Sequence, residues 1–218
     1  MARLRKAAKI WAKPNARELA GHAMIPSDGP VFAINPAAIF GRRAPLEIEI
    51  GAGKGEFIIE RAAARPEHDF LAVELSATVA RVLAVRCGRA GLENLRVARM
   101  DARALVNVFL ADASVAAYHI YFPDPWPKGR HIKHRLFTSQ LSAALFRTLA
   151  AGGTVYVATD VREYAGEIFA MIEGAGFIRA AELAPGARAT GFARKYLAAG
   201  KPVYSASFRK PAHSSSSG

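Results

Sequence analysis

Short apolar runs alternate with longer amphipathic segments along the chain from about Leu46 onward. Runs of strand length occur at Leu46–Ile50, Phe70–Val73, Leu95–Ala98, Ala117–Phe122, Thr154–Ala158 and Val203–Phe208. Segments of helical length lie between them, at Gly55–Ala64, Ala77–Ala90, Ala102–Val108, Thr138–Leu149 and Arg162–Gly174. Such alternation is typical of a parallel sheet covered by helices. The pattern predicts an α/β fold that is doubly wound, with a mostly parallel seven-stranded sheet.

The end of the chain predicts an antiparallel addition to this sheet, because the strand at Val203–Phe208 can pair with a strand near Phe177–Glu182. Residues 41–212 are expected to form one domain. Residues 1–40 carry a basic start and several prolines, so we expect an irregular N-terminal extension there. The serine-rich residues 213–218 are predicted to be a disordered low-complexity tail.

The charge balance points to a polyanionic partner. The 218 residues include 30 Lys and Arg against 18 Asp and Glu, so the formal net charge is +12. Nucleic acid is the first partner to consider and an anionic membrane surface the second, and composition does not choose between them. The chain has no apolar run of the roughly 18 residues that a membrane span needs.

The single cysteine, Cys87, excludes an internal disulfide and a thiolate metal cluster, so we expect a reducing, cytoplasmic location and no metal. Cys87 lies in a predicted helix, where a small buried hydrophobic side chain is expected rather than a nucleophile.

A glycine-rich turn follows the first predicted strand. Gly51, Gly53 and Gly55 lie between this strand and the next helix, and missing Cβ atoms let a backbone approach a cofactor closely. The spacing is Gly-x-Gly-x-Gly rather than the dinucleotide fingerprint, so a tight turn without any ligand stays open as an alternative.

Three acidic residues lie at the predicted carboxyl ends of successive strands: Glu49, Glu74 and Asp101. An acid at the position of Glu74 in this architecture usually accepts hydrogen bonds from ribose hydroxyls. Asp101, before Ala102, is placed to accept from an adenine amino group or to cap a short helix. Two phosphates would be repelled by so many carboxylates, whereas the sulfonium of S-adenosylmethionine would be attracted.

A proline-rich loop and a cationic tract follow the fourth predicted strand. Pro123, Pro125 and Pro127 restrict their neighbours, so Asp124 is expected on a stiff, extended turn. Six residues from Lys128 to Arg135 can carry positive charge, which suits a polyphosphate backbone beside that acid. The alternative is a loop followed by the solvated face of a helix.

The segment Phe122-Pro123-Asp124-Pro125-Trp126-Pro127-Lys128, with His131, Lys133 and Arg135 after it, resembles the bacterial tRNA (guanine-N7)-methyltransferases, and the likeness runs from about Leu46 to Lys210. The resemblance implies a Rossmann-like methyltransferase fold, S-adenosylmethionine as cofactor and cytoplasmic tRNA as partner. It implies methyl transfer to N7 of the variable-loop guanosine, position 46 in tRNA numbering. The sequence leaves both a monomer and a homodimer open.

The resemblance also implies roles for particular residues. Asp124 would be catalytic and would line the cofactor site together with Glu49, Gly51, Gly53, Glu74, Asp101 and Ala102. The substrate and RNA would meet Lys128, Arg130, His131, Lys133, Arg135, Asp160 and Thr190.

The chain departs from the family pattern near its C-terminus. The family has Thr-x-x-Glu, whose acid contacts the target guanine, whereas Thr190-Gly191-Phe192-Ala193 ends in alanine. This difference keeps two alternatives open: an altered-substrate methyltransferase, or an RNA-binding protein with this fold and reduced activity. An NAD-dependent oxidoreductase would fit the glycine turn and Glu74, but no acid–base pair for hydride transfer accompanies them.

Overall fold

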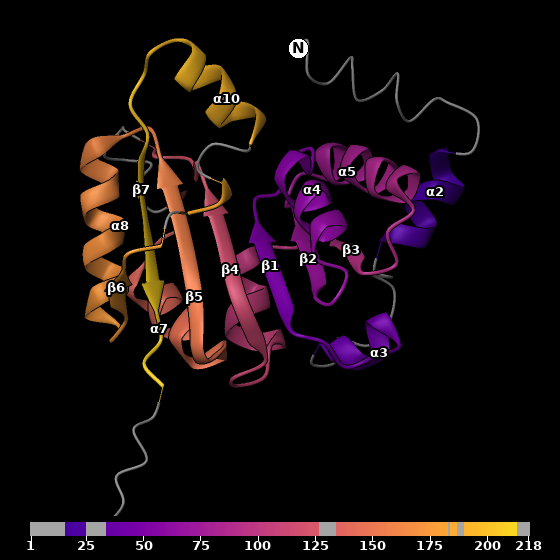
Figure 1. Cartoon of the computed structure of the whole chain (residues 1–218), viewed down its shortest axis with the longest axis horizontal. Helices are drawn as coiled ribbons and strands as arrows, with labels where there is room; N and C mark the ends of the chain where they lie inside the picture. The colour runs from indigo at the N-terminus through magenta and orange to yellow at the C-terminus, as the bar shows by residue number, and fades with distance from the viewer. Residues whose placement is uncertain (1–15, 25–33, 127–133, 183, 187–189, 213–218) are drawn as a thin grey trace, which may run out of the picture. The chain divides into compact units, whose positions relative to one another are not determined.

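The structure is a computed structural model that describes residues 16–24, 34–126, 134–182, 184–186 and 190–212. The chain divides into two compact units, Met1–Phe109 and Leu110–Gly218 (Figure 1). The prediction of an α/β fold with a mostly parallel seven-stranded sheet and an antiparallel C-terminal strand is confirmed.

The first unit contains three parallel strands in the order β3-β2-β1. Its elements are α2 (Ala16–Ala23), α3 (Pro36–Phe40), β1 (Leu46–Ile50), α4 (Glu56–Ala64), β2 (Asp69–Val73), α5 (Ala77–Ala90), β3 (Leu95–Ala98), α6 (Ala102–Ala104) and the π-helical turn η1 (Leu105–Phe109). Every residue of β1 and β2 is buried, as expected for parallel strands covered on both faces. The predicted bounds of β1, α5 and β3 match those of the structure.

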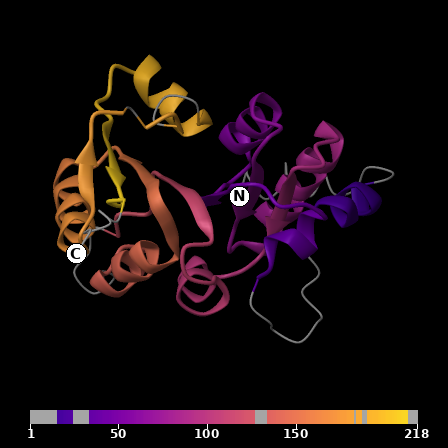
Figure 2. The same ribbon diagram turned by 60° about the horizontal axis from the view of Figure 1, so that its bottom comes forward.

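The second unit contains four strands in the order β4-β5-β7-β6. Its elements are β4 (Val115–Tyr121), α7 (Ser139–Thr148), β5 (Leu149–Thr159), α8 (Arg162–Gly174), β6 (Ile178–Ala180), α10 (Gly191–Ala198) and β7 (Tyr204–Arg209). Strands β4 and β5 are parallel, whereas β7 runs antiparallel to both β5 and β6. Helices α7 and α8 contact each other, and α8 also packs on β5 and β7 (Figure 2).

The prediction of an irregular segment over residues 1–40 is wrong for part of that range, because α2 and α3 are helical. Pro36 occupies the first turn of α3, where its missing N–H is not needed, and Asn35 caps that helix. The small buried residues Ala20 and Ala23 let α2 pack closely on α5. The tail at 213–218 lies outside the described residues.

Candidate functional site

The glycine turn after β1 takes a conformation that only glycine adopts easily. Gly51, Gly53 and Gly55 have φ of 75°, 56° and 72°. A Cβ on Gly55 would lie 2.4 Å from Leu83 Cδ1, so the turn is packed tightly against α5 on that side. A Cβ on Gly53 would meet no described heavy atom nearer than 3.9 Å, and this open space is where a ligand can approach the backbone.

Glu49 is a buried acid directly before this turn, on the last part of β1, with 4% of its surface exposed. Among the described residues, no hydrogen-bond partner is found for its Oε2. Burial raises its pKa well above the ordinary value, the charges of Glu56 and Glu74 raise it further, and the Ile58 backbone N–H opposes them. A buried carboxyl group with an unpaired oxygen is suited to a cationic ligand group.

Glu74 follows β2 and holds the glycine turn. Its Oε2 accepts from the Gly53 N–H at 3.2 Å, and its Oε1 accepts from the Ser76 N–H at 2.8 Å. The acid that the sequence assigns to a ribose is therefore fixed beside Gly53 by the chain itself.

Asp101 caps the short helix α6, which was one of the two roles expected for it. Its Oδ1 accepts from the Arg103 N–H at 2.7 Å, and its Oδ2 pairs with the Arg103 guanidinium at 3.2 Å. Burial acts to raise the pKa of Asp101, but the hydrogen bonds and charge of Arg103 lower it below the ordinary value. Ala102 is buried beside it, and the adenine contact remains a prediction.

The proline-rich loop of the second unit has a strained backbone. Phe122 and Trp126, which precede Pro123 and Pro127, have φ of 53° and 40°, a region that residues other than glycine rarely adopt; the extended turn expected at Asp124 stays a prediction. Such conformations cluster at functional sites, where surrounding contacts hold them. Asp124 lies between them and is exposed.

Arg135 is one of the contacts that hold this loop. Its Nε donates to the Pro125 carbonyl oxygen at 2.7 Å, its guanidinium pairs with Glu167, and its Cζ lies 4.8 Å from the centre of the Tyr164 ring. These contacts occupy a side chain that the sequence assigns to RNA, so the structure supports a role for Arg135 in shaping the loop of Asp124.

The Thr190 segment forms a helix that sequence reasoning missed. Thr190 is the N-cap of α10, and its Oγ1 accepts from the Ala193 N–H at 3.0 Å. Phe192 is 37% exposed, and its ring centre lies 4.8 Å from that of Phe122. The segment thus reaches the start of the loop that carries Asp124.

Asp160 follows β5 and interacts with α10. It does not cap α8, whose N-cap is Val161. A hydrogen bond to Asp160, and the negative charge of that residue, raise the pKa of Tyr196. Tyr196 in turn stacks on Phe192 with a centre-to-centre distance of 4.4 Å. Asp160 and the Thr190 segment, which the sequence predicts as substrate contacts, therefore lie together in this unit.

Four predicted RNA contacts, Lys128, Arg130, His131 and Lys133, lie outside the described residues. Within the described ranges, no group of three or more His, Cys, Asp or Glu side chains could hold a metal ion. The helices in those ranges are too short or too polar to cross a membrane.

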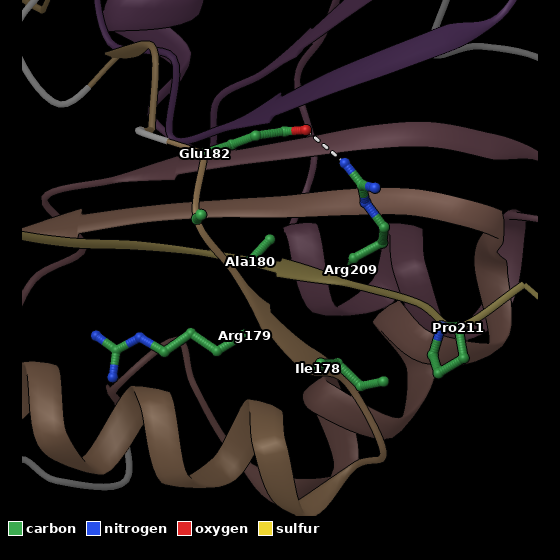
Figure 3. A pocket seen from close by; sticks show the side chains of 7 residues that line it. Ile178, Arg179, Ala180, Glu182, Arg209 and Pro211 are labelled. Atoms are coloured by element: carbon green, nitrogen blue, oxygen red, sulfur yellow. Dashed lines mark hydrogen bonds and ion pairs between the residues drawn. The ribbon is translucent and has the colours of Figure 1, made fainter.

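A pocket of about 410 Å³ opens beside β6 and β7 (Figure 3). It is lined by Ile178, Arg179, Ala180, Ala181, Glu182, Arg209 and Pro211, and Glu182 and Arg209 form an ion pair there. Its lining includes no residue that the sequence assigns to the site.

Sequence reasoning missed His119 and Tyr121, which are buried on β4 and contact each other. The signal was available, because two polar rings two residues apart face the same side of a strand. Polar side chains on a buried strand usually form hydrogen bonds, so such a pair indicates a buried polar contact.

Comparisons with known proteins show which protein family the chain is similar to. Residues 43–206 match a family model described as "Putative methyltransferase". A tRNA (guanine-N(7)-)-methyltransferase of Nitrosomonas eutropha is 42% identical over 154 residues, 69% of each chain. One of Myxococcus xanthus is 38% identical over 185 residues, 80% of this chain and 88% of the relative. Two further relatives are matched over 63% and 56% of their own length.

Solved structures agree with this fold. The 16S rRNA methyltransferase KamB superposes with a TM-score of 0.60 at 14% identity, over 80% of this chain and 91% of that protein. At this identity the likeness concerns the fold alone.

Proposed function

This chain belongs to the tRNA (guanine-N7)-methyltransferase family, and we propose that it transfers the methyl group of S-adenosylmethionine to N7 of a guanosine in tRNA. We further propose that the target is the variable-loop guanosine at position 46 in tRNA numbering, as the Phe122–Lys128 signature suggests. The observation that carries the proposal is the buried carboxyl group of Glu49 next to the open glycine turn, with an Oε2 that has no hydrogen-bond partner among the described residues.

The residues around the turn fit S-adenosylmethionine. Glu49 offers a carboxyl group to the cationic part of the cofactor. The open space beside Gly53 lets the cofactor approach the backbone of the glycine turn. Glu74, at the end of β2, is the proposed acceptor for the ribose hydroxyls. When bound, the cofactor supplies an electrophilic methyl group on a sulfonium centre.

The reaction requires little acid–base catalysis by the protein. Guanine N7 has an in-plane lone pair and carries no proton at neutral pH, so neither a strong base nor a metal ion is needed to activate it. Alignment of N7 with the methyl group is the main requirement, and proximity and orientation supply large rate enhancements. In this proposal Asp124 holds the reacting groups in line and stabilises the positive charge that develops on the purine.

The RNA-contacting part of the proposal rests on the second unit. Asp160 and the Thr190 segment lie together there, and Phe192 of that segment contacts Phe122 two residues before Asp124. The cationic tract that begins at Lys128 would bind the phosphate backbone.

A methylation assay with a chemical readout tests the function. The protein is incubated with labelled S-adenosylmethionine and unmodified tRNA, and the product is treated with borohydride and aniline, which cleave at N7-methylguanosine. We expect scission at the variable-loop guanosine with the wild type, and a loss of about 100-fold or more in kcat/KM for Asp124→Ala.

Asp112→Ala is a matched control, since it removes an exposed acid of the same unit that pairs with Arg147. We expect its kcat/KM to stay within about twofold of the wild type. Equal scission by wild type and Asp124→Ala would refute the role of Asp124, and scission elsewhere in the tRNA would refute the target.

The replacement of the family's acid by Ala193 favours a second candidate, an RNA-binding protein with this fold and reduced activity. Calorimetry separates the two. Binding of both S-adenosylmethionine and tRNA without methyl transfer would favour the second candidate, whereas efficient methyl transfer would exclude it.

A further inference from the structure

The last residue of β4, Tyr121, fixes the chain that leads into α10. Tyr121 is buried, and its Oη accepts a hydrogen bond from the Gly186 N–H at 3.0 Å. A Cβ on Gly186 would lie 1.9 Å from Tyr121 Cε2, so only glycine fits against the ring. The contact therefore combines a hydrogen bond with a close steric fit.

Tyr121 is itself held from within the sheet. His119, two residues earlier on the same strand and fully buried, has its Nδ1 2.9 Å from Tyr121 Oη. The tyrosine oxygen accepts from the Gly186 N–H, so its own phenol proton is available for a hydrogen bond to His119 Nδ1. Each of the two contacts then has one donor and one acceptor. The imidazole ring stacks on Tyr156 of β5 at a centre-to-centre distance of 5.1 Å and an angle of 8°.

The Thr190 segment has a second contact next to the end of β4. The Thr190 N–H donates to the Gly186 carbonyl oxygen at 3.4 Å, which links the N-cap of α10 to the glycine that Tyr121 holds. Phe192 then packs on Phe122, the residue directly after Tyr121. Tyr121, the last residue of β4, and Phe122, directly after it, thus contact Gly186 and Phe192 of the segment.

We propose that Tyr121 is a positioning residue for tRNA binding, which holds the Thr190 segment in register with the loop that carries Asp124. This inference rests on the proposed function, in which the Thr190 segment meets the substrate. Since alanine replaces the acid at position 193, the segment depends on the placement of its backbone and its remaining side chains.

Tyr121→Phe tests the inference because it removes the hydroxyl group and keeps the ring. Tyr118→Phe is the matched control: Tyr118 is also buried on β4, and its Oη lies 2.6 Å from Thr148 Oγ1 on α7. Each variant loses one buried hydroxyl, so both should lower the melting temperature, Tyr121→Phe by more because its Oη has two hydrogen-bond partners.

Only Tyr121→Phe should raise the KM for tRNA, by about tenfold, because small displacements of binding groups have large kinetic effects. The KM for S-adenosylmethionine should stay unchanged in both variants. Gly186→Ala, which forces the segment away from the ring and keeps the hydroxyl, should also raise the KM for tRNA.

An equal rise in the tRNA KM for Tyr118→Phe and Tyr121→Phe would overturn the inference, as would an unchanged KM for both Tyr121→Phe and Gly186→Ala. If the wild type transfers no methyl group, the proposed function fails. The dissociation constant for tRNA, measured by filter binding on the same variants, then decides the inference: weaker binding for Tyr121→Phe than for Tyr118→Phe supports it, and equal binding refutes it.

Discussion

Glu49→Gln should separate stability from cofactor binding, because the two depend on opposite protonation states of one buried group. Burial, with the charges of Glu56 and Glu74, raises the pKa of Glu49 well above its ordinary value. A group whose pKa is raised by folding stabilises the native state fully only below its unfolded pKa, and this contribution is lost as the pH rises through the folded pKa. Glutamine has the same shape and does not titrate.

The difference in unfolding free energy between Glu49→Gln and the wild type should therefore grow with pH. Its slope should reach about 1.4 kcal/mol per pH unit between the unfolded and the folded pKa, and level off above the folded pKa. Urea unfolding at several pH values from about 4 to about 8 measures this slope. Glu60→Gln, the same change at an exposed position of α4, is the control for the substitution itself.

Cofactor binding should respond in the opposite direction. A cationic ligand favours the ionised form of Glu49, so the affinity of the wild type for S-adenosylmethionine should rise with pH, and binding should release protons into the buffer. Glu49→Gln should bind at least about tenfold more weakly and lose this dependence. Calorimetry in buffers of different ionisation enthalpy measures both effects.

A stability difference between Glu49→Gln and the wild type that does not change with pH would refute the assignment of a raised pKa. A variant that binds the cofactor as tightly as the wild type would refute the role of Glu49 in the cofactor site.

Two further changes test the packing of the first unit. Cys87 is buried, and burial raises the pKa of its thiol to about 12. A thiol reagent at about pH 8 should therefore modify the native protein far more slowly than the urea-unfolded protein. Equal rates of modification would contradict the buried position. Glu47 is 1% exposed and pairs with Arg61 at 2.7 Å and Arg65 at 3.0 Å. Glu47→Ala should cost about 3–5 kcal/mol in urea unfolding, because the Arg61 guanidinium, 19% exposed, loses this buried carboxylate, whereas Arg65 still pairs with Glu67. A cost under about 1 kcal/mol would show that water replaces the carboxylate.

The strands β1 and β3 could be predicted from the sequence with their observed bounds. In residues 46–50 and 95–98, apolar side chains are interrupted by Glu47, Glu49 and Arg96 over a stretch of strand length that is bounded by turns, a pattern that predicts strands. The start of β5 was missed because Leu149–Gly153 includes two glycines, which disfavour a strand unless pairing with a neighbour holds them. The pairing of Val115 with Leu149 is long-range and is not visible in local sequence.

Helix α10 was missed although its start carried a signal. Thr190 is a strong N-cap residue, and the same threonine belongs to the substrate-contacting motif that the resemblance implies. The contact between Gly186 and Tyr121 joins positions 65 residues apart, so no pattern in the sequence could reveal it. The acids around the glycine turn were easier to identify, because strand ends of a parallel sheet place successive acids at one edge.

The replacement of glutamate by Ala193 affects base recognition more than the fold of α10. A Thr-x-x-Glu sequence at a helix start is also a capping box, in which the acid accepts from the N-cap backbone N–H. Here the threonine half is kept, since Thr190 Oγ1 accepts from the Ala193 N–H, and the Thr190 N–H donates to Gly186 instead. The helix end is thus satisfied without the acid. Ala193 is also fully buried, so a glutamate at this position would have to displace its neighbours. The carboxylate that the resemblance assigns to the base is absent from this position, whereas Tyr196 of α10 and Asp160 form a hydrogen-bonded polar pair in the same unit.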